Sequence, residues 1–225
     1  MSINPSWFIT GTDTGIGKTA VAIALLDALK QHGITAVGLK PVASGCLWEE
    51  GVWVNEDVRL LHAHSHLPLT ITEINPYAFE VAMAPHLAAA ALGEVIAFAK
   101  IKTAFESLRS RAAVVIEGAG GFLVPLGPEG SVADCCALLQ APIILVVGMR
   151  LGCLNHALLT VEAIQNRGLT LMGWVANQLD PHMMAFEENL TTLKEAIAAP
   201  CLGVMPYGAP TTESSAWLNL EPLLK

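Results

Sequence analysis

The sequence has few charged residues, and basic ones are fewer than acidic ones. Charged residues make up 14% of its 225 residues, lysine and arginine number 12 against 20 acidic residues, and the formal net charge is −8. A chain with this balance lacks the positive surface that attracts nucleic acid or an anionic membrane. We therefore expect small-molecule ligands, no nucleic acid and no membrane partner, so that any anion is bound at a local site.

Cysteines and long apolar runs are also scarce. The five cysteines contain no Cys-x-x-Cys pair, and their odd number argues against a disulfide framework. The first residues carry no basic segment of the kind that begins a signal peptide. The longest apolar run, residues 141–149, is too short to cross a bilayer. These absences favour a protein of the reducing cytoplasm.

Apolar residues, by contrast, make up 53% of the chain. This is a high fraction, and it favours buried parallel strands together with a subunit interface, so we expect a homodimer. The length fits one large domain that spans residues 1–225.

Short apolar runs alternate with helical patterns along the whole chain. Strands are expected at residues 7–9, 35–39, 112–116, 142–147, 171–176 and 202–205, and the clearest helices at 20–29, 56–61, 87–92 and 95–108. The alternation predicts an α/β fold, a single doubly wound and mainly parallel sheet with helices on both faces. Residues 46–55 show no periodicity, and we expect an irregular, mobile flap there.

Residues 10–19, Thr-Gly-Thr-Asp-Thr-Gly-Ile-Gly-Lys-Thr, lie where the first strand turns into the first helix. In such a loop the backbone N–H groups and the helix N-terminus favour a phosphate chain. Lys18 would then reach the phosphate oxygens, and Thr19 would offer its hydroxyl to Mg²⁺. Five residues separate Gly11 from Gly17, one more than in the usual phosphate-loop pattern.

Other polar residues stand at the ends of expected strands. Lys40 directly follows the strand expected at residues 35–39 and precedes a small turn at Ser44. Glu117 directly follows the strand expected at residues 112–116 and precedes several glycines. Because ligands collect outside the carboxyl ends of parallel strands, Lys40 and the phosphate loop should face one crevice. Glu117 has the position of the second acid of a phosphate-loop enzyme. Asp57, in a first helical turn, either caps that helix or meets a metal.

Three further patterns leave alternatives open. Residues 152–155 open a helix and either offer free N–H groups to an anion or form an ordinary helix start. Residues 177–180, Asn-Gln-Leu-Asp, are similar to the Asn-Lys-x-Asp box by which G proteins hold guanine. The histidines at 62, 64 and 66 alternate without further ligands, so we assign no zinc site.

Several motifs taken together resemble those of the dethiobiotin synthetase family, nearly from end to end of the chain. They are Gly-Thr-Asp-Thr-x-x-Gly-Lys-Thr, Gly-x-Lys-Pro-Val-Ala-Ser-Gly, Asn-Pro-Tyr, Ala-Pro-His, Glu-Gly-Ala-Gly-Gly, Leu-Gly-x-x-Asn-His and Gly-Trp-Val-Ala-Asn. Phosphate-loop proteins at large do not share several of these motifs, and the longer loop is also this family's form.

The resemblance implies a phosphate-loop fold and an ATP- and Mg²⁺-dependent cyclo-ligase of biotin biosynthesis. Its substrates would be 7,8-diaminononanoate, carbon dioxide and ATP. One amine becomes a carbamate, the carbamate attacks the γ-phosphate to give a carbamic–phosphoric anhydride, and the second amine closes the ureido ring of dethiobiotin.

The resemblance also implies roles for particular residues. Catalytic roles fall on Lys18, Lys40, Thr14 and Ser44, and Mg²⁺ would be held by Thr19, Asp57 and Glu117. Nucleotide contacts fall on Gly15, Ile16, Gly17, Lys18, Thr19, Ala20, Glu117, Gly118, Ala119, Gly120, Asn177 and Pro206. The substrate would contact Ser44 and, in the partner subunit of a homodimer, the positions Gly152, Cys153, Leu154 and Asn155. Gly15 replaces a glutamate found in many members of the family, so any nucleotide contact made by that side chain is missing.

Two other interpretations belong to a different class. A nucleotide switch of the plasmid-partitioning type often has an extra lysine early in the loop, where this chain has Gly11-Thr12-Asp13. A guanine-dependent metallochaperone would use Asn177 and Asp180, but it usually carries a larger histidine store than three residues.

Overall fold

The computed structural model describes residues 4–209 and 215–224. Six parallel strands form the central sheet in the order β12-β11-β10-β1-β7-β2. The strands are β1 (Ser6–Gly11), β2 (Ala36–Leu39), β7 (Ala113–Glu117), β10 (Ile143–Met149), β11 (Leu171–Gln178) and β12 (Cys201–Met205). The expected α/β fold with a parallel sheet is confirmed, and among the described residues no helix is long and apolar enough to cross a membrane.

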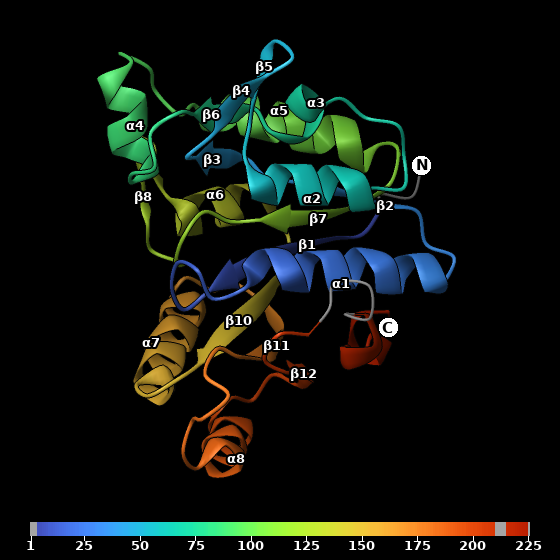
Figure 1. Cartoon of the computed structure of the whole chain (residues 1–225), viewed down its shortest axis with the longest axis vertical. Helices are drawn as coiled ribbons and strands as arrows, with labels where there is room; N and C mark the ends of the chain where they lie inside the picture. The colour runs from blue at the N-terminus through green and yellow to red at the C-terminus, as the bar shows by residue number, and fades with distance from the viewer. Residues whose placement is uncertain (1–3, 210–214, 225) are drawn as a thin grey trace.

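Helices cover both faces of this sheet (Figure 1). They are α1 (Lys18–Gln31), α2 (Glu56–His64), α3 (Ile71–Ile74), α4 (Pro85–Ala91), α5 (Phe98–Arg109), α6 (Val132–Leu139), α7 (Cys153–Asn166), α8 (Phe186–Ala196) and the 3-10 turn η2 (Glu221–Leu223). Short strands pair outside the sheet: β3 (Val42–Ser44) with β6 (Tyr77–Phe79), β4 (Leu47–Glu49) with β5 (Val52–Val54), and β8 (Pro125–Gly127) with β9 (Gly130–Ser131).

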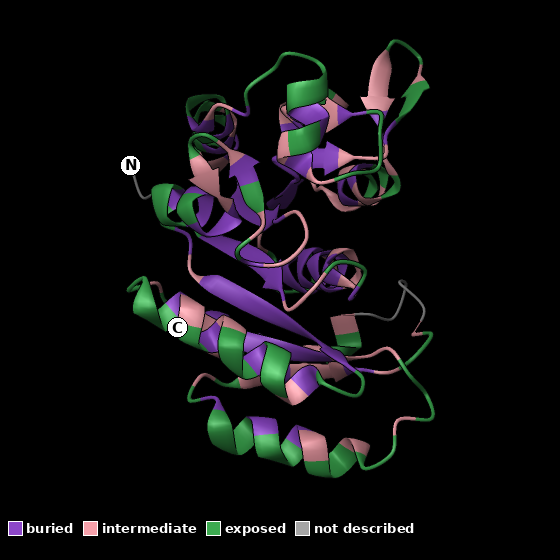
Figure 2. Ribbon diagram, turned by 90° about the vertical axis from the view of Figure 1, so that its left-hand side faces the viewer, coloured by how far each residue is buried: buried purple, intermediate pink, exposed green. Residues whose placement is uncertain are grey.

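Side chains of successive residues of β1 pack into hydrophobic clusters on opposite faces of the sheet, because side chains alternate along a strand with a period of two residues. Trp7 and Ile9 pack in the cluster that includes α1, whereas Phe8 packs in the cluster that includes α5 and α6. A third cluster joins β10 and β11 to α7 and α8. The strands of the central sheet are therefore largely buried on both faces, and most of the exposed residues lie on the outer sides of the helices, in the connections and on short strands outside the sheet (Figure 2).

Two expectations about individual elements are wrong. The helix expected from residue 95 begins at Phe98, because the Glu129 carboxylate accepts from the Phe98 N–H (2.7 Å) and the Tyr77 hydroxyl accepts from the Ala97 N–H (2.9 Å). Partners far away in sequence thus fix this start.

The second concerns residues 46–55, which contain the hairpin β4-β5 and are not irregular. Its turn residues Glu50 (φ 47°) and Gly51 (φ 90°) both have positive φ, as a two-residue hairpin turn of the primed type requires. Trp48 pairs across the strands with Trp53, with ring centroids 5.2 Å apart in an edge-on arrangement. Arg59 of α2 donates to both carboxylate oxygens of Glu49 (2.6 and 2.7 Å), so the hairpin is attached to α2.

Strand order determines what meets at the carboxyl edge of the sheet. The strand β7 lies between β1 and β2, although it follows both of them along the chain. The end of β7 therefore stands between the loop after β1 and the residue after β2, and segments about 100 residues apart in sequence converge there.

Candidate active site

The loop after β1 is shaped by glycines with left-handed backbone. Gly17, at the N-cap of α1, has φ 87°, and a Cβ atom there would lie 2.2 Å from Nδ2 of Asn177. Asn177 donates from Nδ2 to the carbonyl of Ile16 (2.8 Å), so the end of β11 braces this loop. Only glycine combines this φ with so close an approach.

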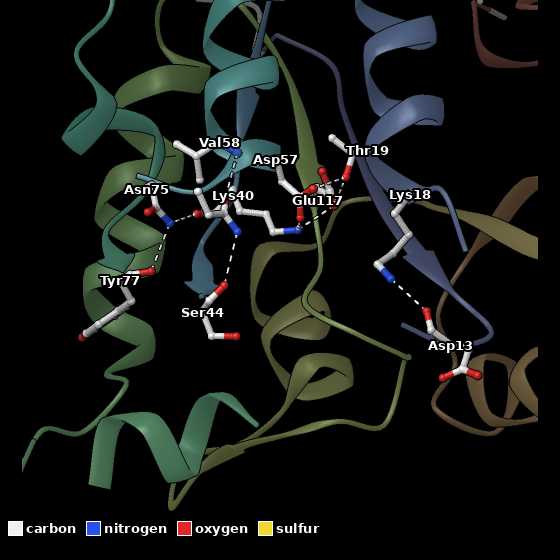
Figure 3. A network of polar contacts seen from close by, with 11 residues as sticks. Asp13, Lys18, Thr19, Lys40, Ser44, Asp57, Val58, Asn75, Tyr77 and Glu117 are labelled. Carbon is white, nitrogen blue, oxygen red and sulfur yellow. Dashed lines mark hydrogen bonds and ion pairs between the residues drawn. The ribbon is translucent and has the colours of Figure 1, made fainter. Parts of the chain in front are cut away.

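Lys18 is the first residue of α1, and its side chain is buried beneath the loop. Its Nζ donates to the carbonyl of Asp13 (2.9 Å), and it points back along the loop (Figure 3). Burial, reinforced by the charge of Lys40, lowers the pKa of Lys18 to about 8. Lys18 is thus a buried cation near the middle of its titration at mildly alkaline pH.

Lys40 lies between two carboxylates. Its Nζ donates to Oε1 of Glu117 (2.6 Å) and to Oδ2 of Asp57 (2.9 Å) (Figure 3). Burial opposes the charged form, but the two carboxylates outweigh it and raise the pKa of Lys40 above its ordinary value. The pKa of Asp57 is lowered, since the nearby Lys40 outweighs the effect of burial. Lys40 is therefore a fully charged ammonium group at neutral pH.

The hydroxyl of Thr19 completes the cluster. It lies 2.8 Å from Oδ1 of Asp57 and 2.9 Å from Oε1 of Glu117. Asn55, not Asp57, caps α2, because the Asn55 side chain accepts from the N–H of Val58 (2.9 Å). Of the two alternatives for Asp57, the helix cap is wrong, and its carboxylate faces the site.

The donor set fits a hard divalent cation. Two carboxylates and one hydroxyl converge, and Oε2 of Glu117 is buried without a hydrogen-bond partner. Oxygen ligands of this kind suit Mg²⁺. Among residues 4–209 and 215–224, no three His, Cys, Asp or Glu side chains gather at a metal-binding spacing. A pair of carboxylates with one hydroxyl is the smaller kind of ligand set with which Mg²⁺ would keep several of its waters.

Comparison with known proteins places this site in a family. Residues 6–215 match the family model described as an AAA domain. The ATP-dependent dethiobiotin synthetase BioD of Aromatoleum aromaticum is 53% identical over 96% of this chain and 97% of its own length. The BioD proteins of Cellvibrio japonicus (50% identity, 97% of each chain) and Xanthomonas campestris (47%, 90% of this chain and 91% of its own) are similar. The chain belongs to the dethiobiotin synthetase family.

Solved structures with a similar fold are much more distant in sequence. The MinD cell division protein of Aquifex aeolicus has a TM-score of 0.57 at 13% identity, covering 94% of this chain and 86% of its own. Chloroplast FtsY of Physcomitrella patens has a TM-score of 0.53 at 17% identity, covering 99% of this chain and 64% of its own. These likenesses show the fold alone.

The remaining expected nucleotide and substrate positions of this dethiobiotin synthetase family member lie in loops and at the ends of several elements. Thr14 is exposed beside the glycine turn after β7, where a Cβ at Gly120 would lie 3.3 Å from the Thr14 hydroxyl. Gly118 and Ala119 continue that turn, Ala20 follows Thr19 in α1, and Pro206 follows β12. Ser44 ends β3, and its carbonyl is 3.4 Å from Nδ2 of Asn55.

The start of α7 is separate from the lysine and carboxylate cluster within one chain. Gly152 (φ 94°) is the N-cap and supplies no side-chain cap, Cys153 is buried, and Asn155 is exposed. In the described part of the chain, no hydrogen bond or ion pair joins residues 152–155 to Lys40, Asp57 or Glu117. The preceding Arg150, however, donates to Oδ2 of Asp13 in the phosphate loop (2.6 Å).

Asp180 and the three histidines have local roles. The Asp180 carboxylate accepts from the N–H of His182 (2.8 Å), as an aspartate in a turn does. The histidines have separate partners: His62 the carbonyl of Leu69 (2.6 Å), His64 the carboxylate of Asp27 (2.9 Å), and His66 the N–H of Ala36 (2.9 Å).

Sequence reasoning missed three residues that hold this site. Asn55 connects the Ser44 turn to α2, Arg150 connects β10 to the phosphate loop, and Asn75 donates to the carbonyl of Lys40 (2.7 Å). The Asn-Pro-Tyr motif at 75–77 was a usable signal for the last. Arg150 also follows the end of a strand, where the rule for parallel sheets points to ligands.

Proposed function

We propose that this chain is an ATP-dependent dethiobiotin synthetase that closes a ureido ring on 7,8-diaminononanoate with carbon dioxide. The observation that carries the proposal is the pairing of the buried Lys40 ammonium group, at the carboxyl end of β2, with the Asp57 and Glu117 carboxylates. A second buried lysine, Lys18, stands at the start of α1 after the loop that follows β1. Relatives named for this activity are 47–53% identical over nearly the whole chain.

The reaction needs two anions to be brought together. A carbamate oxygen attacks the γ-phosphorus and ADP leaves; the second amine then attacks the carbamic carbon and expels phosphate. Lys40 would lie against the carbamate and the transferred phosphoryl group, and Lys18 against the phosphate oxygens. A protein contributes to phosphoryl transfer mainly by placing positive charge in advance at the point where the negative charges approach each other.

Thr19, Asp57 and Glu117 would hold Mg²⁺, which when bound neutralises charge on the phosphate chain. Lys40 contacts the same two carboxylates, which keep its ammonium group charged and within reach of the site. Thr14 and Ser44 would contact the phosphate and the amine end of the substrate. The loop amides of residues 15–17 and the start of α1 would bind the phosphate chain.

Phosphate binding at Lys18 has a pH signature that serves as a prediction. Because its pKa is lowered to about 8, part of the Lys18 side chains are neutral at mildly alkaline pH, and a bound phosphate favours the charged form. Nucleotide binding at mildly alkaline pH should therefore take up a fraction of a proton per site, and less at lower pH, where Lys18 is already charged. Calorimetric titrations in two buffers of different ionisation enthalpy measure this uptake, and identical heats in both buffers would contradict it.

The base is proposed to be adenine. Asn177 is oriented by its bond to Ile16, which leaves its Oδ1 to accept from the exocyclic amine of adenine, whereas guanine carries an oxygen there. Asp180 is engaged in its own turn, which argues against a guanine-reading role. We expect ATP to be preferred in kcat/KM and Asp180→Ala to change the ATP-to-GTP ratio less than about twofold, since a turn carboxylate contributes no base contact. A wild-type preference for GTP that vanishes in Asp180→Ala would reverse the assignment.

A homodimer that shares its sites between subunits is proposed from the exposed apolar residues near the phosphate loop. Leu151 is 98% exposed at the start of α7, and Leu123 and Leu159 line a groove of about 410 Å³ together with Asp13 and Thr14. Exposed leucines beside a polar site are typical of a subunit interface. The substrate carboxylate would then bind residues 152–155 of the partner subunit.

Mixing two inactive variants tests this arrangement. Lys40→Ala disables one part of the site, and Asn155→Asp sets a negative charge where the substrate carboxylate would bind, at a helix start that tolerates acids. If the site is shared, random mixing gives half mixed dimers with one intact site each, and activity returns to about a quarter of wild type. If each site belongs to one chain, no activity returns.

The function itself is tested by its substrate requirement. ATP turnover should depend on both the diamine and bicarbonate. A guanine-dependent switch would instead hydrolyse nucleotide without them and respond to a protein partner.

A further inference from the structure

Asn75 is a buried amide with an unusual position. It follows α3 in the Asn-Pro-Tyr motif, it is 5% exposed, and its backbone N–H donates to the carbonyl of Ile71 (2.9 Å). Among the described residues, the other buried polar or charged ones are Ser6, Thr10, Lys18, Lys40 and Glu117, and the last three belong to the site above. A polar side chain is rarely buried without a specific set of partners.

The partners of Asn75 lead to Lys40. Its Nδ2 donates to the carbonyl of Lys40 (2.7 Å) and to the carbonyl of Tyr77 (3.0 Å), and the N–H of Lys40 donates to the carbonyl of Ile74 (2.8 Å). Both polar groups of the Lys40 main chain are thus bound to residues 74 and 75. Figure 3 shows the Asn75 amide beside the main chain of Lys40, on the side away from the carboxylates.

This support is needed because of where Lys40 stands. β2 is an edge strand that ends at Leu39, and its register with β7 ends at Leu39 and Ile116. The sheet therefore provides no further ladder partner for Lys40, and Pro41 has no N–H of its own. The Tyr77 N–H donates to the Pro41 carbonyl (3.2 Å), and the pairing of β6 with β3 continues this attachment.

The amide also carries a cost. Its Oδ1 is buried without a hydrogen-bond partner, and an unsatisfied buried acceptor destabilises a fold. A residue that served only to fill this space would avoid the cost by being apolar. The two N–H donors are what the position gains from an asparagine.

We propose that Asn75 is a positioning residue that fixes the main chain of Lys40 and so places its ammonium group at the reacting oxygens. The inference rests on the proposed function, because it gives Lys40 a place in the chemistry. A charged group at the end of a four-carbon side chain must be held to within about 0.5 Å, and a shift of about 1 Å can lower a rate roughly a hundredfold. Loss of the amide should therefore lower kcat and leave nucleotide binding nearly unchanged.

The test is a double-mutant cycle between Asn75 and Lys40. Asn75→Ala should lower kcat about tenfold to a hundredfold in the wild-type background, with the Kd for ATP within about twofold. In the Lys40→Ala background, measured by single turnover with labelled bicarbonate, Asn75→Ala should change the rate less than about twofold, since the group it positions is gone. A purely structural role would give the same loss in both backgrounds.

Two further variants make the result decisive. Asn75→Leu has nearly the same size, loses both donors and adds no buried charge, so it replaces the alanine variant if that one does not fold, and it should also lower kcat. Thr70→Ala removes the capping box at the other end of α3 and touches no part of the site, so it should leave kcat within about twofold. Full activity of a folded Asn75 variant, or an equal loss in Thr70→Ala, would overturn the proposal; an inactive wild type would instead overturn the proposed function.

Discussion

Replacing Lys40 with alanine is expected to lower kcat about a hundredfold or more and to leave ATP binding within a few-fold. The ammonium group, 2.6 Å from Glu117 and 2.9 Å from Asp57, stands where the carbamate and the transferred phosphoryl group would meet. A charge aimed at transition-state oxygens in a buried site has effects of this size. Its contribution to binding ground-state ATP should be smaller, because in the proposed site the loop amides and Lys18 would hold the phosphate chain.

The measurement pairs turnover with nucleotide titration and a melting curve. Removing Lys40 leaves the fully buried Glu117 without its cation, and breaking a buried pair in this way costs about 3–5 kcal/mol. Lys40→Ala combined with Glu117→Gln should recover part of that stability without recovering activity.

The matched control is Lys30→Ala, because Lys30 is an exposed lysine in the last turn of α1. This variant should leave both turnover and the melting temperature unchanged. Near-normal turnover of Lys40→Ala would exclude Lys40 from the chemistry.

The second large effect concerns the two carboxylates. Asp57→Asn and Glu117→Gln are each expected to raise the Mg²⁺ concentration needed for half-maximal turnover at least about tenfold. Both native side chains contact the Thr19 hydroxyl. Each substitution removes a negative charge that a hard cation requires of its ligands. Titration of Mg²⁺ at fixed ATP, with excess metal over nucleotide, measures the change.

Controls separate metal binding from folding. Glu106→Gln changes the same residue type on the exposed side of α5 and should not alter the Mg²⁺ requirement. Each variant also needs a melting curve, because both carboxylates neutralise Lys40. Stable variants with an unchanged Mg²⁺ requirement would show that Asp57 and Glu117 do not share a metal.

Local patterns were sufficient to predict the parts of the site that follow single strands. The phosphate loop lies between a buried strand and a helix, and Lys40 and Glu117 stand at strand ends, as their flanking residues indicated. That these positions converge depends on β7 lying between β1 and β2. No local property of Asp57 distinguished a helix cap from a site residue; the presence of Asn55 as the cap decided it.

Other features depend on contacts that no short pattern contains. The β4-β5 turn uses Glu50-Gly51 in place of the commoner Asn-Gly or Asp-Gly, so the hairpin was missed. The start of α5 depends on Glu129, about 30 residues further on. The role of Asn75 depends on the main chain of Lys40, 35 residues earlier, which only the folded chain brings next to it.

The most direct test of the proposed chemistry follows an oxygen atom. In the proposed reaction a carbamate oxygen, derived from carbon dioxide, attacks the γ-phosphorus and leaves with phosphate when the ring closes. With ¹⁸O-labelled carbon dioxide, the diamine and unlabelled ATP, mass spectrometry of the released phosphate should show one ¹⁸O per phosphate, and the ureido carbonyl should keep the other. Phosphate without label, formed at the same rate with and without the diamine, would mean that water attacks ATP and would contradict the assignment.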